Sequence, residues 1–206
     1  LQTGLPVQKD YLDAILISRI NRRIPESPAT WTEYTHRIQL KPADRVIYQQ
    51  ARETAGGDKK VWGACVRALR NTNIRRTLIK ALRRLIRSLE EEGRRILFFA
   101  DSKAEVEELS TALGIEPYPA KGRHTIISVS RGAHGLNDLV CYDTILCRPP
   151  PPDLLPQMQG RLDRPGQKNT DLQLHYFLLA DTIEEGLVLR MAAAAQFGRE
   201  YMMPLT

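Results

Sequence analysis

The clearest pattern in the sequence is a segment, residues 77–92, in which apolar residues recur at helical spacing. This spacing places the apolar side chains on one side of a helix, where they can pack against a core. Gly93 follows at once, and glycine is the usual residue just beyond a helix C-terminus. The apolar positions are Leu78, Ile79, Leu82, Leu85, Ile86 and Leu89, and the arginines that lie off this stripe are Arg83, Arg84 and Arg87.

Other patterns predict a sheet with helices between its strands. Apolar runs at 95–100, 124–129 and 172–179 are typical of buried strands, and residues 34–40 alternate as in a half-buried strand. The segment SKAE at 102–105 is a capping box, which begins a helix that ends at Gly114. Further helices are expected up to about residue 24, from 41 to 52, from 59 to 69, and from 182 through 195. Strands that alternate with helices indicate an α/β fold, in which a parallel sheet is covered on both faces.

Composition excludes several classes of protein. A chain of 206 residues fits one domain with an appended arm, and 42% hydrophobic and 26% charged residues are ordinary for a soluble protein. No apolar run approaches the ~20 residues that cross a membrane. The chain has no apolar leader and does not begin with Met, so we interpret it as a fragment or processed form. Three cysteines without a CxxC pair favour reduced thiols in a cytoplasm, bacterial or phage-infected, or in a nucleus, so we expect a protein that is not secreted and has no metal site.

The charge of the chain is concentrated in one region. The whole chain carries +6, but between Arg67 and Arg95 nine arginines and one lysine face three glutamates, a net charge of +7. The rest of the chain therefore sums to −1. A local basic stretch on a balanced protein suggests a surface that faces a polyanion. A solvated helix face explains the same charges equally well.

The strongest candidate chemistry lies in the run QMQGRLDRPGQ over residues 157–167. Guanidinium groups suit phosphate oxygens because they stay charged and bind in a bidentate way. Arg161 and Arg164 are three residues apart, so on a helix they would point the same way and could reach one polyphosphate. The alternative for an isolated pair of this kind is a solvated basic turn.

This run resembles motif VI of superfamily 2 helicases, in the form found in Swi/Snf-type DNA translocases. The family pattern of Gln, two arginines and a final Gly-Gln is matched at Gln157, Arg161, Arg164, Gly166 and Gln167. Upstream, SVSRGAHGLN over 128–137 resembles motif V of the same family, DTILC at 143–147 resembles the strand that follows it, and DTIEE at 181–185 resembles the family's closing helix. These blocks occur in the family's order, which makes the resemblance specific.

The resemblance covers roughly residues 35–191 and implies the second, C-terminal RecA-like lobe of a two-lobed motor. On this interpretation 1–57 is an entry arm and interlobe connector, and 58–206 is the RecA-like lobe. The implied activity is that of a DNA-dependent ATPase or helicase. The implied cofactor is ATP with Mg²⁺, held mainly by a first lobe that is joined in cis or supplied in trans. The implied partner is DNA, double-stranded and read without sequence preference.

Site residues follow from the same resemblance. Arg164 would be the catalytic arginine finger and Arg161 a second γ-phosphate contact, while Gln157 and Gly135 would belong to the cofactor-binding surface between the lobes. In motif V, Gly132 and Gly135 permit positive φ and close backbone approach, so that amides can face a phosphate. Side chains that would contact nucleic acid are Ser128, Ser130 and Arg131, with Arg83, Arg84 and Arg87 widening the track. The alternative for motif V is a tight turn that needs glycine for geometry alone.

Two features depart from the family. Asp163 stands where the Swi/Snf-type motif usually has His. Only residues 118–123 separate the turn after Gly114 from the motif V strand, whereas a parallel crossover needs about a dozen residues. A strand at 115–120 is therefore not expected to pair in parallel with Ile126. We interpret the lobe as a trimmed form that lacks one strand–helix unit, similar in its economy to phage or viral translocases.

The sequence also lacks the motifs of a complete ATPase. It contains no G-x-x-x-x-G-K-[ST] loop and no Asp-Glu magnesium motif, so the chain alone is not expected to hydrolyse ATP. Two other readings remain: a non-catalytic nucleic-acid-binding or regulatory module that kept the fold, and a partner subunit that supplies its finger in trans. The retained arginines favour the motor lobe, because a pure binding module has no use for an arginine finger.

Overall fold

A computed structural model describes residues 29–55, 58–120, 122–132, 136, 138–152 and 154–201, with the side chains of all of these except 58, 59 and 194–201. Two expectations fall outside the described residues. They are the helix before residue 24 and the contribution of Gly135 to the site.

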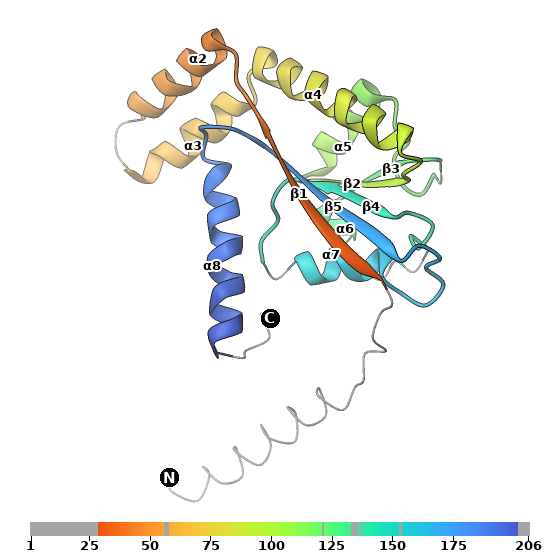
Figure 1. Ribbon diagram of the computed structural model, residues 1–206. Helices are drawn as coiled ribbons and strands as arrows, with labels where there is room; N and C mark the ends of the chain where they lie inside the picture. Colours follow the sequence, from red (N-terminus) through yellow and green to blue (C-terminus); the bar gives the residue numbers. More distant parts are fainter. Residues whose placement is uncertain are drawn as a thin grey trace, which may run out of the picture.

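The described chain forms one parallel sheet of five strands in the order β1-β5-β4-β2-β3 (Figure 1). Every neighbouring pair runs in parallel, which confirms the predicted α/β class. The three expected apolar strands are present and nearly fully buried, and the expected half-buried strand is present as a largely exposed strand. The strands are β1 Thr30–Ile38, β2 Ile96–Ala100, β3 Thr125–Ser128, β4 Thr144–Cys147 and β5 Asp171–Leu179.

Helices cover both faces of the sheet, with α4 and α5 on one side and α6 and α7 on the other (Figure 1). The helix expected from residue 77 begins earlier, at Thr72, because the Asn71 side chain accepts a hydrogen bond from the Asn73 amide and caps it. No helix in the described part of the chain is long and apolar enough to cross a membrane. The helices are α2 Pro42–Glu53, α3 Asp58–Leu69, α4 Thr72–Glu91, α5 Lys103–Leu113, α6 Val129–Gly132, α7 Leu155–Leu162 and α8 Glu185–Tyr201.

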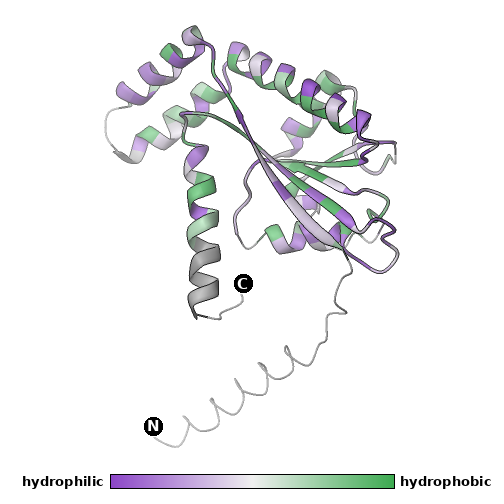
Figure 2. Cartoon of the chain, viewed as in Figure 1, coloured by the Kyte–Doolittle hydropathy of each residue, from purple (hydrophilic) through white to green (hydrophobic). Residues whose placement is uncertain are grey.

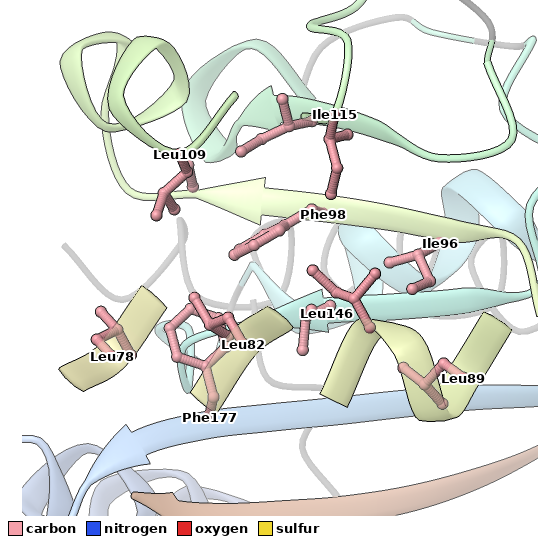
Figure 3. Packing of buried hydrophobic residues seen from close by; sticks show 12 residues of the cluster. Leu78, Leu82, Leu89, Ile96, Phe98, Leu109, Ile115, Leu146 and Phe177 are labelled. Carbon is pink, nitrogen blue, oxygen red and sulfur yellow. The ribbon is translucent and has the colours of Figure 1, made fainter. Parts of the chain in front are cut away.

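Alternate residues of the strands serve the two faces. On the first face Phe98 of β2 packs with the apolar stripe of α4, and its ring meets the Phe177 ring edge-on at 5.5 Å (Figure 3). On the second face Phe99 of β2 packs with Met158 and Leu162 of α7. Strands β2, β3 and β4 are buried at every position, and β2 is apolar over its whole length. Figure 2 shows hydrophobic segments in the strands beside polar ones. The layers that carry α4 and α7 therefore lie on opposite sides of the sheet.

The segment expected to form an arm contributes a strand to this same sheet. Over its whole length, from Thr30 to Ile38, β1 pairs in parallel with β5. It is an edge strand and is mainly hydrophilic (Figure 2). Among the described residues, β1 lies on the N-terminal side of the predicted boundary at residue 57 and pairs with β5 on its C-terminal side. Backbone pairing with a strand so distant in sequence leaves no local signal.

The expectation that residues 115–120 cannot pair with β3 is wrong. Pro117 forms a parallel bridge with Ile126. In that bridge the Tyr118 amide donates to the Ile126 carbonyl at 2.9 Å, and the Ile126 amide donates to the Glu116 carbonyl at 3.2 Å. The limit of about a dozen residues applies to a crossover between full strands. A single bridge needs only that the chain double back, which a short connection allows.

Candidate interlobe and nucleic-acid site

The two arginines of the motif VI run converge on one backbone oxygen. Arg161 Nη1 donates to the Leu136 carbonyl at 3.1 Å, and Arg164 Nη1 donates to the same oxygen at 3.2 Å. The Arg164 Nε also donates to the Gly160 carbonyl. Leu136 belongs to the motif V block, so the structure joins the two blocks that the sequence identified separately.

The convergence does not arise from helical spacing as expected. Helix α7 ends at Leu162, so Arg161 lies on the helix and Arg164 lies in the turn beyond it. In that turn Gly166 has a φ of 102°, a conformation that favours glycine. The Gln167 side-chain Nε2 then donates to the Leu162 carbonyl at 3.1 Å and so anchors the turn. The anchored turn brings the Arg164 side chain back beside that of Arg161.

Burial gives the two arginines different environments. Arg161 is 6% exposed, whereas Arg164 is half-buried. Burial, followed by the nearby positive charge of Arg164, lowers the pKa of Arg161 from its ordinary value. An arginine nevertheless remains protonated at neutral pH, because its pKa starts above 12. The positive charge of Arg164 therefore disfavours the charged form of Arg161. A nearby anion would favour that charged form.

Two other residues of the motif VI run, Gln157 and Asp163, lie in different surroundings from the two arginines. Gln157 is exposed on α7. Asp163, which stands in the family's histidine position, accepts a hydrogen bond from the Trp31 indole at 3.4 Å. This bond joins the end of α7 to the edge strand β1. The departure from the family pattern thus provides a contact between the motif and the sheet.

Motif V lies at the carboxyl end of β3. Ser128 closes the strand, and its Oγ accepts a hydrogen bond from the Arg131 amide at 3.4 Å and lies 3.3 Å from the Ser130 Oγ. Ser128 is nearly buried, whereas Ser130 and Arg131 are exposed. The Arg131 guanidinium lies over the Tyr118 ring at 5.3 Å. Two hydroxyls and one guanidinium are therefore gathered at the end of one strand, where the carboxyl ends of parallel strands commonly bind ligands.

Gly132 has a different role from the one expected. Among the described residues, positive φ occurs at Gly93, Gly114, Gly166 and Asp181, so Gly132 does not supply a left-handed conformation. A Cβ added at Gly132 would lie 2.3 Å from Cε1 of Phe99. The missing side chain therefore lets α6 sit directly on β2. The Gly132 backbone does approach a neighbour closely, but that neighbour is the Phe99 ring, and approach to a phosphate stays a prediction.

The structure does not bring the arginines of α4 to this site. Arg83, Arg84 and Arg87 are exposed on α4, which covers the sheet face opposite to α6 and α7. The Arg83 Nε donates to the Ala112 carbonyl at 3.1 Å, and this bond ties α4 to the end of α5. These three residues therefore form a surface separate from motif V.

An ionic cluster that no sequence motif predicted lies at the carboxyl edge of the sheet. Arg148 follows β4 directly, and its guanidinium binds Glu105 at 2.7 Å, Glu184 at 3.1 Å and Asp101 at 3.2 Å. Burial opposes ionisation of Glu105, but Arg148 and the other donors outweigh it and lower the pKa of Glu105. Asp101 directly follows β2, and Arg148 directly follows β4. A charged residue just after an apolar strand is the sequence feature that could have predicted this cluster.

The donor chemistry of this cluster is that of a structural ion network. Arg75 also binds Glu105, at 3.0 Å, and so links α4 to α5. No group of three or more His, Cys, Asp or Glu side chains in the described part of the chain is arranged to hold a metal ion. The cluster therefore joins the layers at the edge of the sheet.

Comparison with known proteins bears on the family and the fold of the chain. No protein-family model matches the chain. Over 206 residues it is 42% identical to "Putative helicase L115" of Acanthamoeba polyphaga mimivirus, and this match covers 100% of the chain. The chain spans 16% of the length of that relative. Among solved structures, the C-terminal part of the Fun30 ATPase domain aligns with a TM-score of 0.58 and 13% identity, covering 79% of this chain and 89% of that one.

The sequence match and the structural match give different information. The match to the viral relative shows homology across the whole chain, and the match to Fun30 shows a shared fold. Together they confirm the resemblance drawn from motifs V and VI, including its viral character. The chain is thus homologous to a segment of a giant-virus helicase-like protein, and it has the RecA-like fold of the C-terminal part of a Swi/Snf-type ATPase domain.

Proposed function

We propose that this chain acts as the second motor lobe of an ATP-dependent DNA translocase or helicase. The observation that carries the proposal is the convergence of Arg161 and Arg164 on the Leu136 carbonyl, at 3.1 and 3.2 Å. A fold alone does not define an activity. Two guanidinium groups held together beside a motif V backbone, however, form a donor set that suits the oxygens of a polyphosphate.

In this proposal the transferred phosphoryl group is stabilised by charge. Phosphoryl transfer depends mainly on positioning and neutralisation, and an arginine delivered from outside the nucleotide-binding lobe can raise the rate by ~10³-fold or more. Arg164, the less buried of the pair, would be the arginine finger, and Arg161 would make the second contact. Gln157 would line the same interlobe surface. ATP and Mg²⁺ would be held mainly by the first lobe.

The same proposal assigns the DNA track to motif V. Ser128, Ser130 and Arg131 gather donors at the end of β3, and such groups bind phosphate oxygens without reading bases. Leu136 belongs to the same motif V block and accepts from both arginines of motif VI. A shift of either arginine towards a nucleotide would therefore be felt at the motif V backbone, which is the coupling that a DNA-driven ATPase requires.

The test is DNA-stimulated ATP hydrolysis by a polypeptide that contains this chain together with a first lobe, beside the 206-residue chain alone. We expect activity in the longer polypeptide and none in the chain. Arg164→Ala should lower the stimulated rate ~10³-fold. The matched control is Lys168→Ala, which removes an exposed charge near the same turn and should leave the rate unchanged.

Three results would contradict the proposal in different ways. Full activity of the Arg164→Ala variant would remove the finger assignment. Activity of the short chain alone would remove the division of labour between lobes. If the longer polypeptide is inactive while the chain still binds DNA, the chain is a nucleic-acid-binding module and not a motor lobe.

A further inference from the structure

The outer face of α4 carries an uninterrupted row of positive charges. The helix buries Ile74, Leu78, Leu82, Ile86 and Leu89, and at 100° per residue the cationic positions fall almost opposite this stripe. All are exposed. The basic stripe consists of Arg76, Lys80, Arg83, Arg84 and Arg87.

The stripe is not neutralised within the protein. Arg83 is held by the Ala112 carbonyl, a neutral group. For the other four members, no hydrogen bond or ion pair with another described residue is present. Acidic residues occur in α4 only at its C-terminal end, at Glu90 and Glu91. Like charges four residues apart destabilise a helix, as in the pairs Arg76 with Lys80 and Lys80 with Arg84. We interpret the retention of these destabilising charges as a sign that they bind an anionic ligand.

The stripe and the exposed motif V side chains lie on opposite sides of the sheet. The apolar stripe of α4 packs on the sheet face that carries Phe98, whereas α6 and α7 pack on the face that carries Phe99. The outer side of α4 therefore faces away from α6 (Figure 1). The sheet therefore lies between the basic stripe and the exposed side chains of Ser130 and Arg131 on α6.

We propose that the basic stripe of α4 binds the phosphate backbone of a second nucleic-acid segment while motif V holds the first. This inference relies on the proposed function only for the identity of the first ligand. Protein interfaces depend on buried apolar or aromatic anchors, and the stripe offers none. Its cations repeat at a rise of ~6 Å per four residues, which suits a regular row of phosphates. A duplex backbone is therefore favoured over an acidic protein.

The first experiment measures binding of a short duplex by fluorescence anisotropy over a range of salt concentrations. The stripe variant is Lys80→Gln/Arg84→Gln/Arg87→Gln, and glutamine keeps the helix propensity. The control variant is Lys41→Gln/Lys60→Gln/Lys103→Gln, which removes the same charge at exposed sites elsewhere. Loss of three phosphate contacts should reduce the slope of log K against log salt by roughly 3. The control should leave that slope unchanged.

The second experiment measures bridging. One duplex is fixed to beads, and capture of a second, labelled duplex by the 206-residue chain is recorded. Wild-type and control proteins should bridge. The stripe variant should bind the fixed duplex through motif V and fail to capture the second. Sedimentation should show the same oligomeric state for all three proteins, and equal unfolding midpoints should show that the stripe variant is folded.

The outcomes separate this inference from the proposed function. If the stripe variant bridges as well as wild type, the inference is wrong. If poly-glutamate displaces the labelled duplex at a lower charge concentration than unlabelled duplex does, the stripe is a site for acidic protein. If Ser130→Ala/Arg131→Gln abolishes all binding and the stripe variant loses nothing, motif V is the sole DNA site and only the inference fails. If wild type binds no duplex, both fail.

Discussion

Replacing Gly132 with alanine tests whether the motif V glycine is there for packing. In the structure a Cβ at this position would lie 2.3 Å from Cε1 and 3.0 Å from Cδ1 of Phe99. Phe99 is 1% exposed and lies in the core beneath α6 and α7. A buried ring cannot move aside as the end of a flexible side chain can, so α6 or β2 must shift to admit the methyl group.

The magnitude follows from two opposing effects. Overpacking a well-packed core costs about 1–3 kcal/mol. Alanine in a helix gains up to about 1 kcal/mol over glycine. The gain should be small here because α6 spans only Val129–Gly132. We therefore expect Gly132→Ala to lower the unfolding free energy by about 1–2 kcal/mol.

The assay is urea unfolding followed by circular dichroism, with the slope m compared between variants to show that the unfolded states match. Gly63→Ala is the matched control. Gly63 also lies within a helix, α3, and its nearest neighbour is Nη1 of Arg67 at 3.4 Å, the flexible end of a side chain. We expect it to gain up to about 1 kcal/mol. The packing argument is refuted if Gly132→Ala is as stable as wild type or gains as much as Gly63→Ala does.

Three further predictions concern groups outside the candidate site. Arg148→Ala leaves three carboxylates without their shared cation and should cost about 3–5 kcal/mol in urea unfolding, whereas the exposed control Arg84→Ala should change stability by less than about 0.5 kcal/mol. Burial raises the pKa of the Cys147 thiol, so in the native protein a thiol reagent should label the half-buried Cys141 first and Cys147 only after unfolding. Burial, followed by nearby His and Arg side chains, lowers the pKa of His175 from 6.5 to about 4, so protonation favours the unfolded chain between these values. Unfolding free energy should therefore rise between about pH 4 and 6.5, and His175→Gln should flatten part of that rise, as urea titrations at several pH values would show.

The elements that the sequence predicted well are those whose signals are local. The apolar stripe of residues 77–92 predicts a helix, and the structure confirms that helix as part of α4. Ser102 caps α5 through the Glu105 amide at 3.2 Å, and Gly114 ends it with a φ of 72°. In each case the responsible residues lie within a few positions of one another, so the pattern and its physical cause occupy the same stretch of chain.

The elements that the sequence could not predict depend on contacts between distant residues. Pairing of β1 with β5 joins residues such as Thr30 and Asp171, and nothing near either residue specifies the other. Helical spacing was expected to place Arg164 beside Arg161. The two side chains do meet, but a turn beyond the end of α7 brings them together. The motif indicated which residues belong together, and tertiary structure determined how they meet.

The shared carbonyl of Leu136 gives the proposed coupling a physical basis. Burial, followed by the positive charge of Arg164, lowers the pKa of Arg161, so an anion brought near the pair would stabilise the Arg161 cation. An arginine drawn towards that anion would lengthen or break its hydrogen bond to Leu136, and the motif V backbone would lose a fixed point. Linkage requires the reverse effect to be equal in free energy. If motif V binds DNA as proposed, fixing its backbone should change how readily the arginines reach a nucleotide, and the Leu136 carbonyl would couple the two proposed sites.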